Sequence, residues 1–366
     1  MKNKLLYLSS SVIPSQSANS VHVMKMCQAF NKYYNVDLLC YTTENECNED
    51  DIFSRYGIIN KFKISPLYIK RLRGKFFQKI FQILKILKSY NKNTMIYGRD
   101  GYSVYLAALL GYKVYYESHG LPISKLYTFI EKSLFKHKNF KKLIVISDKL
   151  KELYLTTNNL LNNDNIKVLH DGADELDLSK KGTDLGTGFH IGYIGSLYYE
   201  GRGVDVILEV AKLNPDFHFH LVGGKDEEVK YWQQKAIKNI KFHGFLPHNE
   251  ASQYLLSFDV VLMPYQKNLM LADMKVNTSS WMSPMKMFEY MSAKKAIVSS
   301  SMPVIREVLN KNNSILVEPN RINEWSDAVN ILFKDCNLRN KIANNSYNDF
   351  KQNYTWLQRA ESIKCL

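Results

Sequence analysis

Ser283-Pro284-Met285-Lys286-Met287-Phe288-Glu289-Tyr290 has the pattern of a helix start. Ser283 is a preferred N-cap residue, and Pro284 suits the first helical position, where its missing N–H costs nothing. Lys286 then falls in the first turn, where the helix dipole disfavours a cation by a few tenths to about 1 kcal/mol. An anion bound at the helix N-terminus would remove this conflict, with Glu289 on the same face. A surface helix in which Lys286 and Glu289 pair with each other is the alternative, and spacing alone does not separate the two.

The residues that follow extend this pattern with a short apolar strand, 296–300, and with Pro303-Val304-Ile305-Arg306-Glu307. Together, 283–307 resembles the S-P-x-K-x-F-E-Y-M…P-I-V…P-V-x-R-E segment of family 4, group 1 glycosyltransferases, which have the GT-B fold and retain the anomeric configuration. The resemblance implies that Lys286 and the adjacent helix N-terminus, with Met287 in the same segment, bind the donor diphosphate. It also implies that Glu289 binds the ribose. Trp281 replaces the first Glu of the family's Glu-(seven residues)-Glu motif.

The composition fits a globular protein of two domains, with 366 residues of which 45% are hydrophobic. No apolar run reaches the roughly 18 residues of a membrane-spanning helix, and the amino-terminal residues lack the apolar core of a signal peptide. Five scattered cysteines without C-x-x-C spacing indicate reduced thiols in a cytoplasmic protein. The net charge of +14 indicates an anionic partner, such as nucleic acid, a membrane face or a phosphorylated substrate.

The amino-terminal part reads strand 5–9, loop 10–20, helix 21–33 and strand 36–41, which predicts a parallel right-handed unit. The loop lacks the G-x-G-x-x-G of dinucleotide-binding proteins, which counts against an NAD enzyme. It resembles the first loop of the same glycosyltransferase family. The resemblance implies that the loop lies on the acceptor side of the site, with its side chains Ser17, Asn19 and Ser20 facing the cleft.

Residues 61–92 carry ten Lys or Arg and no acidic residue. Apolar residues repeat at helical spacing between Phe77 and Leu87, with Lys75, Lys79 and Lys85 on another face. Such a basic amphipathic helix suits an anionic membrane surface. A helix packed on its own sheet, with its lysines in solvent, fits the pattern equally well.

Glu117-Ser118-His119 follows a predicted strand, at the edge where open α/β sheets bind their ligands. It resembles the E-x-H strand end of the family, which implies that His119 contacts the donor sugar. The first domain offers no convincing carboxylate for a double displacement, and Glu117 is the nearest candidate.

The second half repeats the strand–glycine–helix pattern. Arg202 stands beside a predicted helix start at Gly203, where a cation is unfavourable unless an anion binds there. The resemblance places Arg202 on the diphosphate beside Lys286, and implies that the nucleotide sugar is bound by Gly195, Ser196, Gly223 and Phe245. His218 and His220 share one face of a strand, but no third ligand fits by spacing, so we interpret them as structural and expect no metal.

The predicted fold class is α/β, with the GT-B fold of two doubly wound Rossmann-like domains facing a central cleft. The domains are an acceptor-binding domain at 1–172, a linker at 173–188, a nucleotide-sugar-binding domain at 189–350 and a C-terminal helix at 351–366. From the resemblance, we expect this last helix to cross back to the first domain.

The predicted activity is a metal-independent, retaining hexosyl transfer from a nucleotide diphosphate sugar to a lipid-linked or oligosaccharide acceptor, without a cofactor. The family's common setting is bacterial surface polysaccharide synthesis, in the cytoplasm or peripherally on the inner face of the plasma membrane. A GT-B-fold epimerase remains an alternative. A basic nucleic-acid-binding protein is another, although no RNP, zinc or helix-turn-helix signature supports it.

Overall fold

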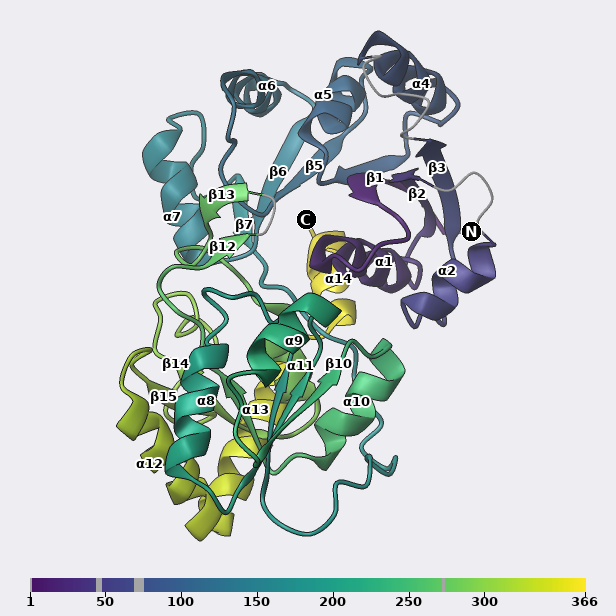
Figure 1. The fold of residues 1–366 in the computed structure, drawn as a ribbon. Coiled ribbons are helices and arrows are strands. Elements are labelled where there is room, and N and C mark those ends of the chain that lie inside the picture. The colour runs from purple at the N-terminus through teal and green to yellow at the C-terminus, as the bar shows by residue number, and fades with distance from the viewer. Residues whose placement is uncertain (1, 44–47, 69–75, 272–273) are drawn as a thin grey trace. The chain divides into compact units, whose positions relative to one another are not determined.

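The computed structural model describes residues 2–43, 48–68, 76–271 and 274–366, which form two compact units. The first unit runs to His170 and includes Trp356–Leu366, and the second unit is Asp171–Thr355. Each unit contains a parallel sheet with helices, so the predicted α/β class is confirmed (Figure 1). Cys47, Lys70, Arg71, Arg73 and Lys75 lie outside the described residues.

In the first unit, seven described strands form one parallel sheet. Their order is β3 (Lys63–Tyr68), β2 (Asn35–Thr42), β1 (Lys4–Val12), β4 (Met95–Gly98), β5 (Val114–Ser118), β6 (Phe140–Val145) and β7 (Ile166–Val168). The helices are α1 (Ala18–Phe30), α2 (Glu49–Arg55), α4 (Phe76–Lys88), α5 (Gly101–Leu109), α6 (Lys125–Lys136), α7 (Asp148–Thr157) and α14 (Trp356–Lys364). The sequences of these strands are almost continuously apolar, because helices cover a parallel sheet on both faces.

The loop predicted at 10–20 is shorter than expected, because β1 continues to Val12 and α1 begins at Ala18 instead of 21. The helix begins early because Ser17 acts as its N-cap: the Ser17 side chain accepts a hydrogen bond from the backbone N–H of Ser20 at 3.2 Å. Ser20 is buried and donates to the carbonyl of Ser17, whereas Ser17 and Asn19 are exposed.

The basic segment forms a helix, α4, as predicted, but its apolar side chains divide into two groups. Ile83 and Leu87 are buried in the first unit. Phe77 and Phe81 are 83% and 69% exposed, so the helix does not bury its whole apolar stripe against its own sheet.

In the second unit, six described strands form a parallel sheet, and β12 (Met270–Leu271) and β13 (Met274–Asn277) form a separate antiparallel pair. The order of the large sheet is β10 (Ile240–Gly244), β9 (His218–Val222), β8 (His190–Ile194), β11 (Val260–Met263), β14 (Ala296–Ser300) and β15 (Ile315–Val317). The helices are α8 (Val204–Leu213), α9 (Asp226–Gln233), α10 (His248–Ser257), α11 (Met285–Ser292), α12 (Ile322–Lys334) and α13 (Cys336–Asn353).

Helix α14 lies at the end of the chain but packs on α1 within the first unit (Figure 1). The ring of Trp356 meets that of His22, with centroids 5.1 Å apart and planes at 83°. The last helix therefore contributes side chains to the residues around β1 and β5. Within the part of the chain that the structure describes, no helix combines the length and apolar character needed to cross a bilayer.

Candidate active site

In the second unit, helix α11 begins one residue later than the sequence suggested. Pro284 is the N-cap and Met285 the first helical residue, where Ser283 was expected as the cap. The hydroxyl of Ser283 instead accepts a hydrogen bond from the backbone N–H of Asp171 at 2.9 Å, in a buried position. Lys286 remains in the first turn, so the conflict between its charge and the helix dipole is present in the structure.

The ammonium group of Lys286 is enclosed by aromatic rings and backbone. Its Nζ atom lies 3.8 Å from the ring centroid of Tyr193 and 5.2 Å from that of Tyr265. The side chain is partly exposed, but Nζ itself is shielded from solvent, and no hydrogen-bond acceptor among the described residues pairs with it. Burial lowers the pKa of Lys286 well below its ordinary value, and Arg202 lowers it further while Glu289 opposes the shift.

Arg202 is the second cation of this site. Its guanidinium carbon lies 5.5 Å from the ring centroid of Tyr265, so both cations meet one aromatic ring. Its Nε is buried without a partner among the described residues. Gly203, the N-cap of α8, has a left-handed φ of 73°, and a Cβ there would lie 1.9 Å from the carbonyl oxygen of Pro264. Only glycine fits at position 203, so this residue allows Arg202 to lie near the end of β11.

Two glycines, Gly195 and Gly223, allow close packing of the backbone near Lys286. Gly195 has φ +150°, and a Cβ there would lie 2.5 Å from Lys286 Nζ. Gly223 has φ +112°, and a Cβ there would lie 2.2 Å from the carbonyl oxygen of Gly195. Side chains at either position would fill the space that the lysine and the backbone now occupy.

The other predicted donor residues differ in their surroundings. Glu289 has a side chain 31% exposed, and its Oε1 lies 4.0 Å from Nε2 of His248. Phe245 is 57% exposed, and Ser196 is half-buried. Met287 is buried in the core of the second unit, so the structure does not bring its side chain to Lys286.

The histidines on the strands of this unit contact one another in a row. Nδ1 of His190 lies 3.1 Å from Nε2 of His220, whose Nδ1 lies 3.1 Å from Nε2 of His243. Burial lowers the pKa of His220 to about 3 and that of His243 to about 4. The rings of His220 and His243 are therefore neutral near pH 7. His220 bonds to a histidine on either side, which supports its interpretation as a structural residue.

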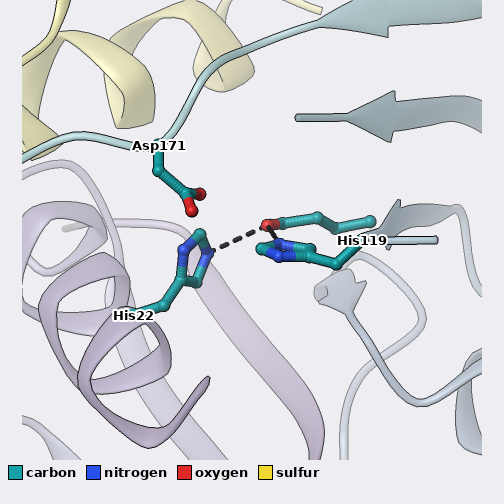
Figure 2. Close-up of side chains that lie close together, drawn as sticks. His22, His119 and Asp171 are labelled. Carbon is teal, nitrogen blue, oxygen red and sulfur yellow. Dashed lines mark hydrogen bonds and ion pairs between the residues drawn. The ribbon is translucent and has the colours of Figure 1, made fainter. Parts of the chain in front are cut away.

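In the first unit, His119 follows β5 as predicted and binds the carboxylate of Glu117. Its Nε2 lies 2.5 Å from Glu117 Oε1, and Nε2 of His22, from α1, lies 2.9 Å from the same oxygen. Figure 2 shows the two labelled histidines, with dashed lines to that oxygen. The figure also labels Asp171, the first residue of the second unit. The two rings are nearly perpendicular, with centroids 4.8 Å apart.

Glu117 is too enclosed to serve as the nucleophile that its position suggested. It is 1% exposed, and its two oxygens contact His22, His119, Arg359 and the hydroxyl of Tyr97. Burial raises the pKa of Glu117, but the charges of Arg359 and His22, with the hydrogen bond from His119, hold it well below its usual range. Glu117 is therefore an ionised, fully engaged carboxylate that orients the groups around it.

Sequence reasoning found the cations and His119 but missed the side chains that surround them. Tyr193 lies two residues before the strand-end glycine, and Tyr265 follows Pro264 at the end of β11, so both had a positional signal. His22 directly follows the loop that resembles the family's first loop, although no role was assigned to it. Arg359 had no signal, because it reaches Glu117 from a helix far away in the sequence.

Comparisons with known proteins show which families and folds the chain resembles. Residues 188–335 match the family model described as glycosyl transferases group 1, and residues 11–152 match glycosyl transferase 4-like. A comparison with curated protein sequences gives no match.

Three solved structures illustrate the similarity in fold. HepE of Anabaena in complex with UDP has 14% identity and a TM-score of 0.72, over 99% of this chain and 98% of that chain. Sucrose-phosphate synthase from Thermosynechococcus elongatus has 15% identity and a TM-score of 0.71, over 99% and 98%. A TarM variant of S. aureus in complex with fondaparinux, α-GlcNAc-glycerol and UDP has 11% identity and a TM-score of 0.71, over 99% and 99%.

At these identities the structural likeness establishes the fold, and the two family models establish the class of enzyme. The chain is a glycosyltransferase with a 4-like domain at 11–152 and a group 1 domain at 188–335, and it has the GT-B fold.

Proposed function

We propose that this glycosyltransferase moves a sugar from a nucleotide diphosphate donor to its acceptor with retention at the anomeric carbon. The observation that carries the proposal is the pair of cations in the second unit, Lys286 and Arg202, each beside a helix N-terminus and sharing the ring of Tyr265. Two shielded cations close enough to lower the pKa of Lys286 are costly unless a multiply charged anion binds between them.

In this proposal the protein stabilises the departing diphosphate without a metal. Lys286, Arg202 and the N-termini of α8 and α11 form a preorganised positive region where negative charge develops as the sugar–phosphate bond breaks. Glu289 accepts hydrogen bonds from the ribose hydroxyls, and the segment at Phe245 borders the base. His119 contacts the donor sugar. The departing phosphate takes the acceptor proton, since Glu117 is fully engaged by its neighbours.

The structural neighbours indicate where to begin the search for donor and acceptor. HepE of Anabaena was solved with UDP-glucose, and another neighbour, WaaB, is a lipopolysaccharide outer core galactosyltransferase. We therefore propose a UDP-sugar as the donor, a lipid-linked or oligosaccharide acceptor, and a role in the cytoplasmic stage of bacterial surface polysaccharide synthesis.

The test is a panel of UDP-, GDP-, ADP- and dTDP-sugars, scored by thermal stabilisation and by slow hydrolysis in the absence of acceptor. We expect one base to stabilise the protein above the others, and its sugar to be released with its anomeric configuration kept, as followed by proton NMR. Inversion would refute the retaining mechanism, and isomerisation of the sugar without transfer would favour the epimerase. Salt-sensitive binding to duplex or single-stranded DNA with no response to any nucleotide sugar would favour a nucleic-acid-binding protein.

A matched variant checks the ribose contact within the same experiment. Glu289→Gln should reduce the stabilisation given by the ribonucleoside diphosphate and leave that of its 2′,3′-dideoxy analogue unchanged. Equal losses for both compounds would remove Glu289 from the ribose site.

We also propose that the first unit docks on an anionic membrane face through helices α4 and α6, which both pack against α5. Large apolar side chains are more than half exposed on these helices, at Phe77, Phe81, Leu126 and Phe129, and just before α6, at Ile123. Neither helix offers an exposed carboxylate: α4 has no acidic residue, and the one acidic residue of α6, Glu131, is buried against the hydroxyl of Tyr116. Exposed apolar groups among lysines, without acidic residues, fit a negatively charged lipid surface.

Vesicle binding should rise with the anionic lipid content and fall as salt shortens the Debye length from ~10 Å at 0.1 M to ~3 Å at 1 M. Phe77→Ser with Phe81→Ser should weaken binding at low salt, and Lys79→Gln with Lys85→Gln should reduce its salt dependence. Phe333→Ser, at an exposed position of the second unit, is the matched control. If the parent protein does not bind anionic vesicles at low salt, the membrane proposal is wrong and the lysines serve only as a solvated surface.

A further inference from the structure

A buried carboxyl group of α6 is connected to the end of β5 by a chain of hydroxyl groups. Glu131 is 3% exposed, and its Oε1 accepts a hydrogen bond from the hydroxyl of Tyr116 at 2.7 Å. The hydroxyl of Tyr154, from α7, lies 3.1 Å from the same oxygen. Tyr154 also lies 2.7 Å from Oγ of Ser118, the residue before His119. The chain therefore joins three elements of the first unit.

Ser118 closes the turn that carries His119. Its Oγ donates to the carbonyl oxygen of Gly120 at 2.7 Å and accepts from the backbone N–H of the same residue at 3.3 Å. The hydroxyl of Tyr154 lies farther from that carbonyl oxygen, at 3.2 Å. The conformation of the turn after β5 thus depends on the hydroxyl of Ser118.

The number of protons fixes the direction of the chain. A carbonyl oxygen has no proton to donate, so Ser118 uses its single proton on Gly120. The 2.7 Å contact between Ser118 and Tyr154 must then use the proton of Tyr154. A hydrogen bond between Tyr154 and Glu131 consequently needs a proton from the carboxyl group. The geometry is that of a neutral carboxylic acid.

The surroundings of Glu131 favour this neutral form. Burial raises its pKa to about 7, and the hydrogen bonds from Tyr116 and Tyr154 oppose the shift only in part. A third tyrosine on α6, Tyr127, faces Glu131 and is itself influenced by Asp100, the N-cap of α5. Burial raises the pKa of all three tyrosines, so they stay protonated near pH 7. Within the described ranges, no cation forms an ion pair with Glu131 that would keep it ionised.

We infer that Glu131 is a positioning residue for sugar transfer: as a neutral acid it completes, through Tyr154 and Ser118, the hydrogen-bonded chain that holds the turn carrying His119. An ionised Glu131 can only accept, so the four contacts of the chain would share three hydroxyl protons and one contact would lack a proton. The turn is then held less firmly. Its part in catalysis rests on the proposed function, whereas the protonation of Glu131 does not.

The first measurement needs neither a substrate nor transfer activity. Carbon-13 spectra of the side-chain carboxyl groups follow the ionisation of each glutamate, and the signal that Glu131→Gln removes is that of Glu131. We expect this group to be neutral at about pH 6 and ionised at about pH 8, on either side of its pKa of about 7. A Glu131 that is already ionised at the lower pH would overturn the inference even if sugar transfer is confirmed.

Glu131→Gln then separates the proton from the packing. The glutamine amide imitates the neutral acid at every pH, because it donates to Tyr154 and accepts from Tyr116. The kcat of the parent enzyme should fall by about 2–10-fold as the pH rises through about 7, the effect of one hydrogen bond, and Glu131→Gln should not show this fall. The KM for the donor should change little, because the diphosphate site lies in other residues.

The same substitution has an effect on stability that does not depend on the reaction. The folded pKa of Glu131 lies above the ordinary value, so the stability that the neutral acid contributes is lost as the pH rises through about 7. Thermal unfolding should therefore show a smaller loss of stability between about pH 6 and 8 in Glu131→Gln than in the parent protein. Equal losses in the two proteins would contradict the raised pKa.

Two further variants complete the test. Tyr154→Phe breaks the chain between Glu131 and Ser118, so its kcat should be reduced at every pH and should lack the fall near pH 7. Glu152→Gln is the matched control, since Glu152 is an exposed glutamate of α7 paired with Lys149, and it should keep the parent pH profile. A folded Glu131→Gln enzyme with the parent profile would reduce Glu131 to a structural role. If that variant does not fold, the parent spectrum and Tyr154→Phe still decide the matter.

Discussion

Replacing Lys286 with methionine should weaken nucleoside diphosphate binding by about 1–3 kcal/mol, the loss expected for a charge-assisted hydrogen bond. The same change should raise the thermal stability of the ligand-free protein. The ammonium group stands at the positive end of helix α11, shielded from water and near Arg202, so burial lowers its pKa well below the ordinary value. Methionine keeps the length of the side chain and removes the charge. Calorimetric titration with the diphosphate and thermal unfolding without it measure the two effects.

Lys295→Met is the control, because Lys295 follows α11 and donates to the carbonyl oxygen of Leu256 at 2.7 Å. A cation at that end of a helix is favourable, so this variant should lose stability and keep its affinity for the diphosphate. Unchanged affinity in a folded Lys286→Met protein would remove the lysine from the diphosphate site. Lower stability in that variant would show that the charge is already compensated in the ligand-free state.

Replacing His119 with alanine should lower turnover by about 100-fold or more, the scale found for single preorganised contacts in other enzymes. The reason is that the imidazole, oriented by Glu117, is proposed to contact the donor sugar. Affinity for the free nucleoside diphosphate should barely change, because that ligand carries no sugar for the ring to touch. Single-turnover kinetics with the best donor of the panel, together with titration of the diphosphate, separates the two effects.

His137→Ala is the control for this experiment, since His137 also follows an element of the first unit, where its Nδ1 accepts a hydrogen bond from the backbone N–H of Asn139 at 3.2 Å. It should transfer sugar at the parent rate. A His119→Ala protein with parent turnover would exclude the ring from the site, and one that also loses diphosphate affinity would indicate a general disturbance of the fold.

Sequence patterns predicted the elements whose signals are local. The apolar strands, the glycine turns after β8 and β9, and the first turn of α11 with Lys286 all depend on residues within a few positions of one another. Local signals also explain the errors. The Ser17 cap moved the start of α1, and Ser283 was expected to cap α11 although its hydroxyl binds a backbone N–H from position 171.

The remaining features depend on contacts between residues far apart in the sequence, which a local periodic pattern does not reveal. Arg359 and Glu117 are 242 residues apart, and their pairing requires the last helix to pack on the first unit. The exposure of Phe77 and Phe81 also depends on tertiary packing, because helical spacing alone places them on the same stripe as the buried Leu87.

The origin of Arg359 in the last helix has a consequence for how the protein folds as it leaves the ribosome. All of 171–355 must be synthesised before α14 appears, which takes roughly 10–40 s at bacterial and eukaryotic elongation rates of about 5–20 residues per second. During that interval the nascent first unit has Glu117 without its arginine, so burying this carboxylate is unfavourable. The amino-terminal unit should therefore remain loosely packed around β5 on the ribosome and complete its core only once α14 has left the exit tunnel.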